Sequence, residues 1–408
     1  MTGRAPGLGS AQSARPQVTL VQQDAEEVEG DEYIPARRPE HLGQGERNPP
    51  SALKAEEACK NTIITESILS TIGHTPLVRL TRALPDCPFR LFAKLEGFNP
   101  GGSAKDRPAL HILQEAMRTG AVKAGTVVIE SSSGNLGIGL AQACRYLGLR
   151  FICVVDPKTT TQNICILKAY GAEIDLVLEP DPVTGEFLQA RIDRVQTLLQ
   201  TIENSFWTNQ YANLSSAQAH YRTTMHEIAT ELDGRIDYLF VAISTCGTLR
   251  GCAEYVRNHH LGTKIFAVDA HGSVIFGGKP AKRLIPGHGA ARQPELFRAG
   301  LADECVRVTD LDCVVGCRRL VRSEAILAGG SSGGVLTAVE QVKERIPRGA
   351  TCALIFHDRG ERYLDTIYSD EWVEEHFGDI AHLWQEQREL QPWMMASRFL
   401  EGPKSPRY

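Results

Sequence analysis

The feature that most constrains the fold is an alternation of continuous apolar runs with amphipathic stretches, which starts near Ile64. Apolar runs without alternating polar residues indicate strands buried on both faces, and helices between them indicate parallel sheets. The sequence therefore predicts the α/β class. The expected strands are Val127–Glu130, Phe151–Val155, Ile174–Leu178, Tyr238–Ile243, Lys264–Val268 and Cys352–Phe356. The expected helices are Asp106–Arg118, Leu136–Tyr146, Thr161–Tyr170, Ser216–Glu231 and Gly333–Arg345.

The long stretch Gly185–Asn213 separates two series of strands and indicates two doubly wound α/β domains with a ligand between them. We expect a larger domain at 61–98 and 214–376, and a smaller, mobile domain at 99–213. Residues 377–408 form a C-terminal extension whose Trp384, Trp393 and Met394 could pack on the body or on a second subunit.

Residues 1–60 are rich in proline and glycine, contain few large apolar side chains and carry an acidic cluster near residues 24–32. Such a composition buries too little apolar surface to offset the entropy of ordering, so a disordered tail is expected. The alternative is a regulatory or partner-binding arm.

The charge and the apolar pattern exclude several classes of function. With 44 basic and 49 acidic side chains the net charge is −5, and no half of the chain is basic enough to favour nucleic acid. We find no run of 18 apolar residues and no apolar core of a signal peptide, so we expect no membrane contact and a cytoplasmic protein. The 11 cysteines fit that location as free thiols. Cys305, Cys313 and Cys317 could be metal ligands, but no paired CxxC accompanies them, so no metal site is expected.

The first of four glycine- and serine-rich turns, Asn99–Arg107 (NPGGSAKDR), puts Lys105 at the start of a helix. A partly desolvated lysine in the positive field of a helix start has a lowered pKa and can form a Schiff base with an aldehyde. The alternative is a solvated surface lysine beside a turn.

The other three turns offer anion sites. Glu130–Gly139 (ESSSGNLGIG) follows a strand and opens a helix, so its hydroxyls and free N–H groups suit a carboxylate. Ser244–Gly251 (STCGTLRG) has the same context and suits a phosphate, without a Walker lysine for nucleotide hydrolysis. Gly329–Gly334 (GGSSGG) precedes a helix and could serve only to let its start pack tightly. A phosphate site, a Schiff-base lysine and a carboxylate site together indicate pyridoxal 5′-phosphate and an amino-acid substrate.

NPGGSAKDR, SSSGN, STCGT, GGSSGG and GERY occur in the order in which they stand in a known family, and IGHTPLVRL (Ile72–Leu80) matches as well. Over residues 63–375 the chain resembles the fold-type II pyridoxal-phosphate enzymes of the cysteine synthase and cystathionine β-synthase group. The resemblance implies a homodimer that acts on small amino-acid substrates.

The resemblance also assigns roles residue by residue. Lys105 would form the Schiff base and move the α-proton, and Asn135 would hydrogen-bond the 3′-oxygen of the cofactor. The cofactor phosphate would be held by Ser244, Thr245, Cys246, Gly247 and Thr248, with Cys246 in place of a usual glycine. Ser331 would face the pyridine nitrogen, where a neutral hydroxyl favours loss of a β-substituent over transamination. Ser132, Ser133 and, on the looser match TNQYAN, Gln210 would hold the substrate carboxylate.

Several details lean away from cysteine synthase. Leu136 replaces the threonine of SGNTG, Cys246 and Arg250 interrupt GGTLTG, and HDRGERY replaces DSGERY. With AKDRPALHI, AGGSSGG and LDTIYSDEWV, these details resemble the synthases that make N-(2-amino-2-carboxyethyl)-L-glutamate from O-phospho-L-serine and L-glutamate, a step toward 2,3-diaminopropionate in siderophore biosynthesis. The alternatives are cysteine synthase, cystathionine β-synthase without its regulatory domains, and a non-catalytic paralogue that binds a partner.

A phosphorylated substrate needs a cation for its leaving group, and arginine suits phosphate best. Arg250, beside the phosphate loop, is the candidate. Arg107 is a second one, for which a structural ion pair is the favoured interpretation.

Overall fold

The computed structural model describes residues 64–182 and 185–385. The expected tail at 1–60 and most of the expected C-terminal extension, including Trp393 and Met394, lie outside these residues. Trp384 is 8% exposed and packs into a hydrophobic core of the larger sheet.

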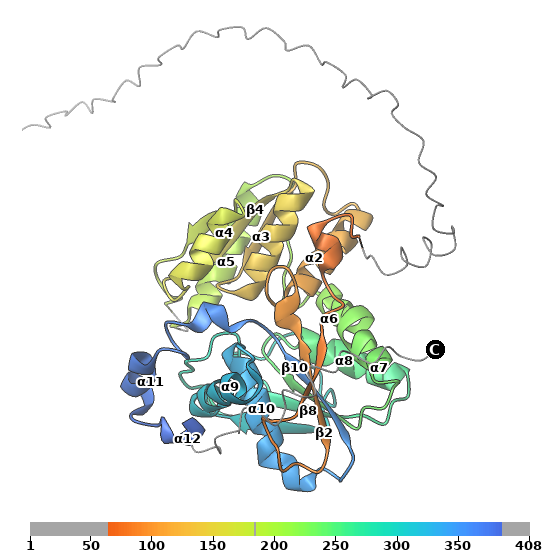
Figure 1. Ribbon diagram of the computed structural model, residues 1–408. Coiled ribbons are helices and arrows are strands. Elements are labelled where there is room, and N and C mark those ends of the chain that lie inside the picture. Colours follow the sequence, from red (N-terminus) through yellow and green to blue (C-terminus); the bar gives the residue numbers. More distant parts are fainter. Residues whose placement is uncertain (1–63, 183–184, 386–408) are drawn as a thin grey trace, which may run out of the picture. The chain divides into compact units, whose positions relative to one another are not determined.

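The larger sheet has six strands in the order β1-β2-β10-β7-β8-β9 (Figure 1). Only β1 is antiparallel to its neighbour, and the other strands run parallel. The bounds are β1 (Leu77–Leu80), β2 (Arg90–Leu95), β7 (Tyr238–Ala242), β8 (Lys264–Ala270), β9 (Glu304–Val308) and β10 (Thr351–Phe356).

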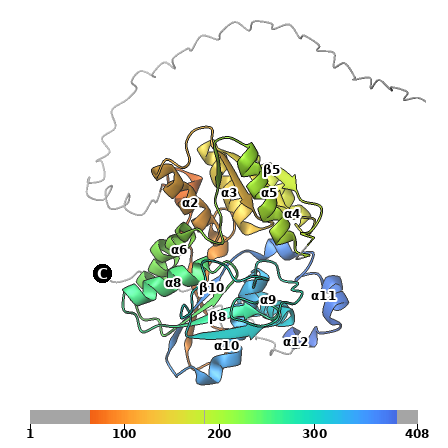
Figure 2. The same cartoon turned by 180° about the vertical axis from the view of Figure 1, so that it is seen from behind.

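Helices cover both faces of this sheet, which explains why its strands are continuously apolar. In β7, Phe240 belongs to the core beneath α9 (Asp310–Glu324) and α10 (Gly330–Val342), whereas Leu239 belongs to the core beneath α7 (His226–Glu231) and α8 (Gly247–Asn258). Figures 1 and 2 show these two pairs of helices on opposite sides of the strands.

The smaller sheet has four parallel strands in the order β5-β4-β3-β6. One face packs against α2 (Asp106–Arg118), α3 (Asn135–Leu147) and α4 (Thr161–Ala169), and the other packs against α5 (Phe187–Thr201). The strands are β3 (Val127–Ser131), β4 (Arg150–Val155), β5 (Glu173–Leu176) and β6 (Ser205–Trp207).

The expected helix Ser216–Glu231 is not a continuous α-helix, and this part of the prediction is wrong. It consists of α6 (Leu214–His220), a π-helical turn (Tyr221–Met225) and α7. Strands β1, β2, β6 and β9 were not predicted. The other elements outside the prediction are α5, which lies within the stretch Gly185–Asn213 that was expected only to separate the two series of strands, α9, the short helices Ile68–Thr71, Glu96–Phe98 and Gly360–Tyr363, and α11 (Asp370–Phe377) and α12 (His382–Gln385).

Each sheet reverses its strand order once, between β7 and β10 in the larger sheet and between β3 and β6 in the smaller one. Ligands of such sheets bind beyond the carboxyl ends of the strands at these reversal points. The segments that follow these four strands are therefore where a site is expected. Among the residues that the structure describes, no helix is long and apolar enough to cross a membrane.

Candidate active site

Three loops meet at the carboxyl end of β10. The backbone N–H of Ala104 donates to the carbonyl oxygen of His357 over 2.8 Å, and Ser103 forms an antiparallel bridge with Asp358. On the other side, the N–H of Gly329 donates to the carbonyl oxygen of Asp358 over 3.1 Å. These backbone contacts bring the turn of Lys105 and the turn of Ser331 to the same strand end.

Lys105 is the N-cap residue of α2, and its side chain is half-buried. Burial lowers the pKa of its ammonium group, although the negative charges of Asp358 and Glu96 oppose that shift. A lysine with a lowered pKa holds more of the neutral amine that forms a Schiff base.

Asn135 begins α3 directly after the turn that follows β3. Its Nδ2 donates to Asp358 Oδ2 over 2.8 Å, and Arg362 NH1 donates to its Oδ1. The hydroxyl of Tyr363 donates to the same Asp358 oxygen over 2.5 Å. Asp358, Arg362 and Tyr363 were not assigned roles from the sequence, although the motif HDRGERY contains all three.

The expected phosphate loop, Ser244–Thr248, lies between β7 and α8. Cys246 is the N-cap of α8 and has a left-handed backbone with φ of 66°, a conformation that glycine adopts without strain. Thr245 and Thr248 are 7% and 5% exposed. The loop therefore presents free N–H groups and hydroxyls at the start of a 12-residue helix, a donor set that suits a phosphate.

The turn expected to bind the substrate carboxylate follows β3, and Gln210 reaches it from the segment that follows the neighbouring strand β6. Ser132 Oγ accepts from the N–H of Gly137 over 3.0 Å, and Gln210 Nε2 donates to the carbonyl oxygen of Ser131 over 3.3 Å. Buried Glu130, missed from the sequence, accepts the N–H of Gln210 over 3.2 Å. Glu130 thus fixes the backbone of Gln210 near the serines. The side chain of Ser133 is half-buried in the same turn.

Ser331 is 9% exposed in the first turn of α10, and neighbouring Ser332 is fully buried. Cys317 Sγ donates to the carbonyl oxygen of Gly329 over 3.3 Å and so ties this turn to α9. The turn lies beside Asp358, as described above, which places the Ser331 hydroxyl on an element that borders the Lys105 turn.

The two arginine candidates are both engaged by carboxylates. Arg250 Nε donates to Glu254 Oε1 over 2.7 Å, one turn along α8. Arg107 is 2% exposed and forms 2.6 Å ion pairs with Glu96 and Glu227. Burial raises the pKa of Glu227, but the hydrogen bonds and charge of Arg107 outweigh it and lower that pKa to about 2.

The ten cysteines of the described chain are free thiols. Cys313 and Cys317 are buried in α9, where the Sγ atom of Cys313 lies 3.6 Å from His288 Nδ1. Within residues 64–182 and 185–385 there is no group of three or more His, Cys, Asp or Glu side chains that could hold a metal ion.

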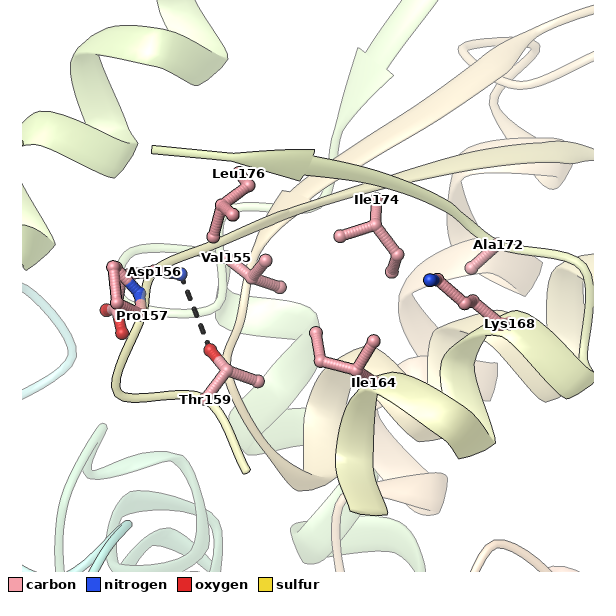
Figure 3. Close-up of a pocket in the computed structure, with 9 residues that line it drawn as sticks. All are labelled: Val155, Asp156, Pro157, Thr159, Ile164, Lys168, Ala172, Ile174 and Leu176. Atoms are coloured by element: carbon pink, nitrogen blue, oxygen red, sulfur yellow. Dashed lines mark hydrogen bonds between the residues drawn. The ribbon is translucent and has the colours of Figure 1, made fainter. Parts of the chain in front are cut away.

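A pocket of about 480 Å³ lies apart from the predicted site residues, none of which lines it. Figure 3 shows Ile164 of α4 and Ile174 of β5 pointing toward one another across it, with Asp156 and Lys168 near its opposite ends. The dashed bond joins the N–H of Asp156 to Thr159 Oγ1 over 3.4 Å.

Comparison with known proteins identifies the family. The pyridoxal-phosphate dependent enzyme family matches residues 68–358, so this chain belongs to that family. Its structure is similar to that of O-ureido-L-serine synthase, with a TM-score of 0.70 and 30% identity over 76% of this chain and 98% of the other. An O-acetylserine dependent cystathionine β-synthase from Helicobacter pylori matches with a TM-score of 0.71 and 30% identity over 76% and 100%. A hydrogen sulfide-producing enzyme from Fusobacterium nucleatum matches with a TM-score of 0.69 and 30% identity over 74% and 99%.

These similarities confirm the predictions of an α/β fold, of an enzyme and of pyridoxal phosphate as the cofactor. The residues present fit that cofactor, because a lysine with a lowered pKa, an anion-binding helix start and a neutral serine hydroxyl match its aldehyde, phosphate and pyridine nitrogen. The individual site residues remain predictions.

Proposed function

We propose that the chain joins O-phospho-L-serine and L-glutamate to give N-(2-amino-2-carboxyethyl)-L-glutamate and inorganic phosphate. The choice of a phosphorylated substrate rests on the environment of Arg191, a residue of α5 that is 8% exposed. Its Nε forms a 3.3 Å ion pair with Asp156 Oδ2 that lacks hydrogen-bond geometry, and neither Nε nor NH1 has a hydrogen-bond acceptor among the described residues. An arginine with buried, unbound N–H groups is the chemical complement of a phosphate dianion.

Arg191 lies close to the expected substrate turn. Burial raises the pKa of the Tyr211 hydroxyl, and the nearby charge of Arg191 opposes that shift. Tyr211 follows Gln210 at the carboxyl end of β6. The same charge opposes the rise that burial causes in the pKa of Cys153, whose Sγ donates to the carbonyl oxygen of Ser132 over 3.1 Å. Asp156, the ion-pair partner of Arg191, lies two residues after Val154, whose carbonyl oxygen accepts the N–H of Ser132 over 3.2 Å, and this proximity supports Arg191 as the group that contacts the substrate phosphate.

Bound pyridoxal phosphate withdraws electrons from the substrate Cα, so that the Cα–H bond becomes acidic and a group on Cβ can leave. In our proposal the neutral amine of Lys105 takes the proton from Cα and later returns it to the same carbon. The Cβ–O bond breaks with its electron pair on the phosphate, and the amine of glutamate forms the new Cβ–N bond and gives up one proton. Arg191 stabilises the charge of the departing phosphate.

Glutamate as the second substrate is supported by the sequence details around AKDRPALHI, AGGSSGG and LDTIYSDEWV. A related function, cysteine synthesis from O-acetylserine and sulfide, is the second candidate, because one similar structure is an enzyme that depends on O-acetylserine. The siderophore role, the cytoplasmic location and the homodimer belong to the same proposal, and sedimentation of the pure protein tests the dimer.

The pure protein is incubated with O-phospho-L-serine and either L-glutamate or sulfide, and the product is identified by mass. We expect the glutamate adduct and phosphate in equal amounts. Cysteine formed with sulfide, and no adduct with glutamate, would overturn the choice of second substrate. Products from neither nucleophile would contradict the proposed reaction altogether.

Arg191→Gln and Arg250→Ala are then compared for elimination from O-phospho-L-serine and from O-acetyl-L-serine. Loss of a charged hydrogen bond is worth about 1.5–3 kcal/mol, so kcat/KM for the phosphorylated substrate should fall roughly tenfold or more in Arg191→Gln. The acetylated substrate should be much less affected. Arg250→Ala should change both substrates equally, because Glu254 already binds its guanidinium. If kcat/KM for O-phospho-L-serine fell selectively in Arg250→Ala and not in Arg191→Gln, the phosphate contact would belong to Arg250, as the sequence analysis expected.

A further inference from the structure

His220 is a buried histidine whose two ring nitrogens each contact a threonine hydroxyl. It is 1% exposed at the end of α6, and its Nδ1 lies 2.9 Å from Thr224 Oγ1. Its Nε2 lies 3.2 Å from the Oγ1 of Thr248, in the expected phosphate loop. The imidazole therefore connects the π-helical turn Tyr221–Met225 to the first turn of α8.

The ring is held in this place by close packing. Thr224 is fully buried in the π-helical turn, a feature that is frequent at functional sites. A Cβ atom on Gly251 of α8 would lie 2.3 Å from the carbonyl oxygen of Ala217 and 2.9 Å from His220 Cβ. The two helices can thus approach closely enough for Nε2 to reach Thr248.

The hydrogen atoms can be assigned from the partners. Across residues 64–182 and 185–385, Thr224 Oγ1 has no hydrogen-bond partner other than His220 Nδ1. A fully buried hydroxyl that does not donate is costly, so Thr224 donates to Nδ1. In a neutral imidazole the other nitrogen then carries the proton, so Nε2–H donates to Thr248 Oγ1.

The neutral form is favoured by the surroundings. Burial lowers the pKa of His220 well below its ordinary value, and the positive charge of Arg107 adds to this effect. A protonated ring carries a hydrogen on Nδ1 as well, so Nδ1 could no longer accept the hydroxyl hydrogen of Thr224.

We propose that His220 is a positioning residue that fixes the hydroxyl of Thr248 as a donor to the cofactor phosphate. The Oγ1 atom of Thr248 accepts from Nε2–H, so its own hydrogen is left for an anion at the start of α8. In the opposite tautomer the hydroxyl would donate to Nε2 and would turn a lone pair toward the phosphate. This relay of hydrogen bonds from Thr224 through His220 to Thr248 goes beyond the proposed reaction, because it depends only on the family's cofactor and not on the identity of either substrate.

The test uses Thr224→Val, which keeps the shape of a buried side chain and removes only the far end of the relay. Thr223→Val is the matched control, because Thr223 lies in the same turn and its hydroxyl donates to the carbonyl oxygen of Ala219 over 2.6 Å. The full-length protein is freed of cofactor and titrated with pyridoxal 5′-phosphate and with pyridoxal, which lacks the phosphate. The readout is the ratio of the two dissociation constants.

A neutral hydrogen bond contributes about 1 kcal/mol, so Thr224→Val should reduce the preference for the phosphorylated ligand about fivefold. Thr223→Val should leave the preference within about twofold of the wild type. The affinity for inorganic phosphate should likewise fall in Thr224→Val and stay near the wild-type value in Thr223→Val. Equal weakening of both ligands in Thr224→Val, or equal ratios in the two valine variants, would overturn the proposal.

His220→Gln and His220→Phe give an independent check. Glutamine can still donate to Thr248, whereas phenylalanine cannot, so we expect the preference to be retained in the first variant and reduced about tenfold in the second, the range of a hydrogen bond to a charged group. In the double variant with Thr248→Val, the His220→Phe change should have no further effect. A full additional loss in the double variant would contradict action through Thr248.

Discussion

Asn135 Nδ2 donates a 2.8 Å hydrogen bond to Asp358 Oδ2, and this bond connects the turn after β3 to the carboxyl end of β10. Arg362 donates to Oδ1 of the same amide, so both ends of the Asn135 side chain are fixed. One N–H of the amide remains for another acceptor. The 3′-oxygen of the cofactor is the acceptor that the family resemblance implies.

The first prediction concerns this contact. Asp358→Ala removes the acceptor of Asn135 and of the Tyr363 hydroxyl, so the affinity for pyridoxal phosphate should fall roughly tenfold, as for a hydrogen bond to a charged group. Asp358→Asn keeps an accepting oxygen and should retain most of the affinity. Fluorescence titration of the cofactor-free variants measures the effect. Equal affinities in the alanine and asparagine variants would show that the contact does not position Asn135.

The second prediction concerns Lys105. Lys105→Ala should abolish covalent attachment of pyridoxal phosphate, measured as the mass increase after borohydride reduction, and should abolish turnover. Lys168→Ala is the control, since Lys168 is an exposed lysine that lines the separate pocket of Figure 3. Covalent attachment at wild-type level in Lys105→Ala would overturn the assignment of the Schiff-base lysine.

The third prediction separates backbone strain from packing at Cys246. A residue with a Cβ atom pays about 1–2 kcal/mol in the left-handed region, whereas glycine loses about 0.5–1 kcal/mol of chain entropy. Cys246→Gly should therefore be about 1 kcal/mol more stable than Cys246→Ala, since both lack the thiol but only alanine keeps the strain. Urea denaturation of the two cofactor-free variants measures the difference. A more stable alanine variant would show that the loop relaxes to another conformation.

The long buried strands could be predicted because their signal is local. Val127–Glu130 and Cys352–Phe356 are continuous apolar runs, and the structure confirms both as β3 and β10 with a shift of one residue at one end. Strand β6 has only three residues, and β9 (ECVRV) is interrupted by exposed charged residues, so neither gives such a run. The π-helical turn after His220 depends on the approach of α8 through Gly251, which involves residues about 30 positions away.

The site residues that carry a sequence motif could be proposed, but their partners could not. Lys105 and Ser244–Thr248 lie in recognisable turns, whereas Glu130 and Asp358 act through the residues that folding brings to them. Arg191 lies in an ordinary amphipathic helix, and its importance depends on burial beside Asp156 without further acceptors. Charge pairing of this kind is a property of three-dimensional packing and leaves no pattern along the chain.

The last prediction concerns the pH dependence of stability at Asp106, the residue after Lys105. Its Oδ2 accepts the N–H of Gly101 over 2.5 Å, while its buried Oδ1 has no partner among the described residues. Burial raises the pKa of this carboxyl from 3.8 to about 7, against the opposing effects of the Gly101 N–H and of the Arg362 and Arg359 charges. Between these two values the folded protein holds a proton that the unfolded chain has released.

The contribution of Asp106 to stability is therefore present at low pH and is lost as the pH rises from about 4 to about 7, with a slope of at most about 1.4 kcal/mol per pH unit. Asp106→Asn cannot ionise, so its free energy of unfolding relative to the wild type should increase from pH 5 to pH 8. Urea denaturation of the cofactor-free proteins at pH 5, 6.5 and 8 measures this difference, with exposed Asp365→Asn as the control. A difference that stays constant or shrinks with rising pH would show that Asp106 is ionised throughout the range and that Arg359 and Arg362 compensate its burial.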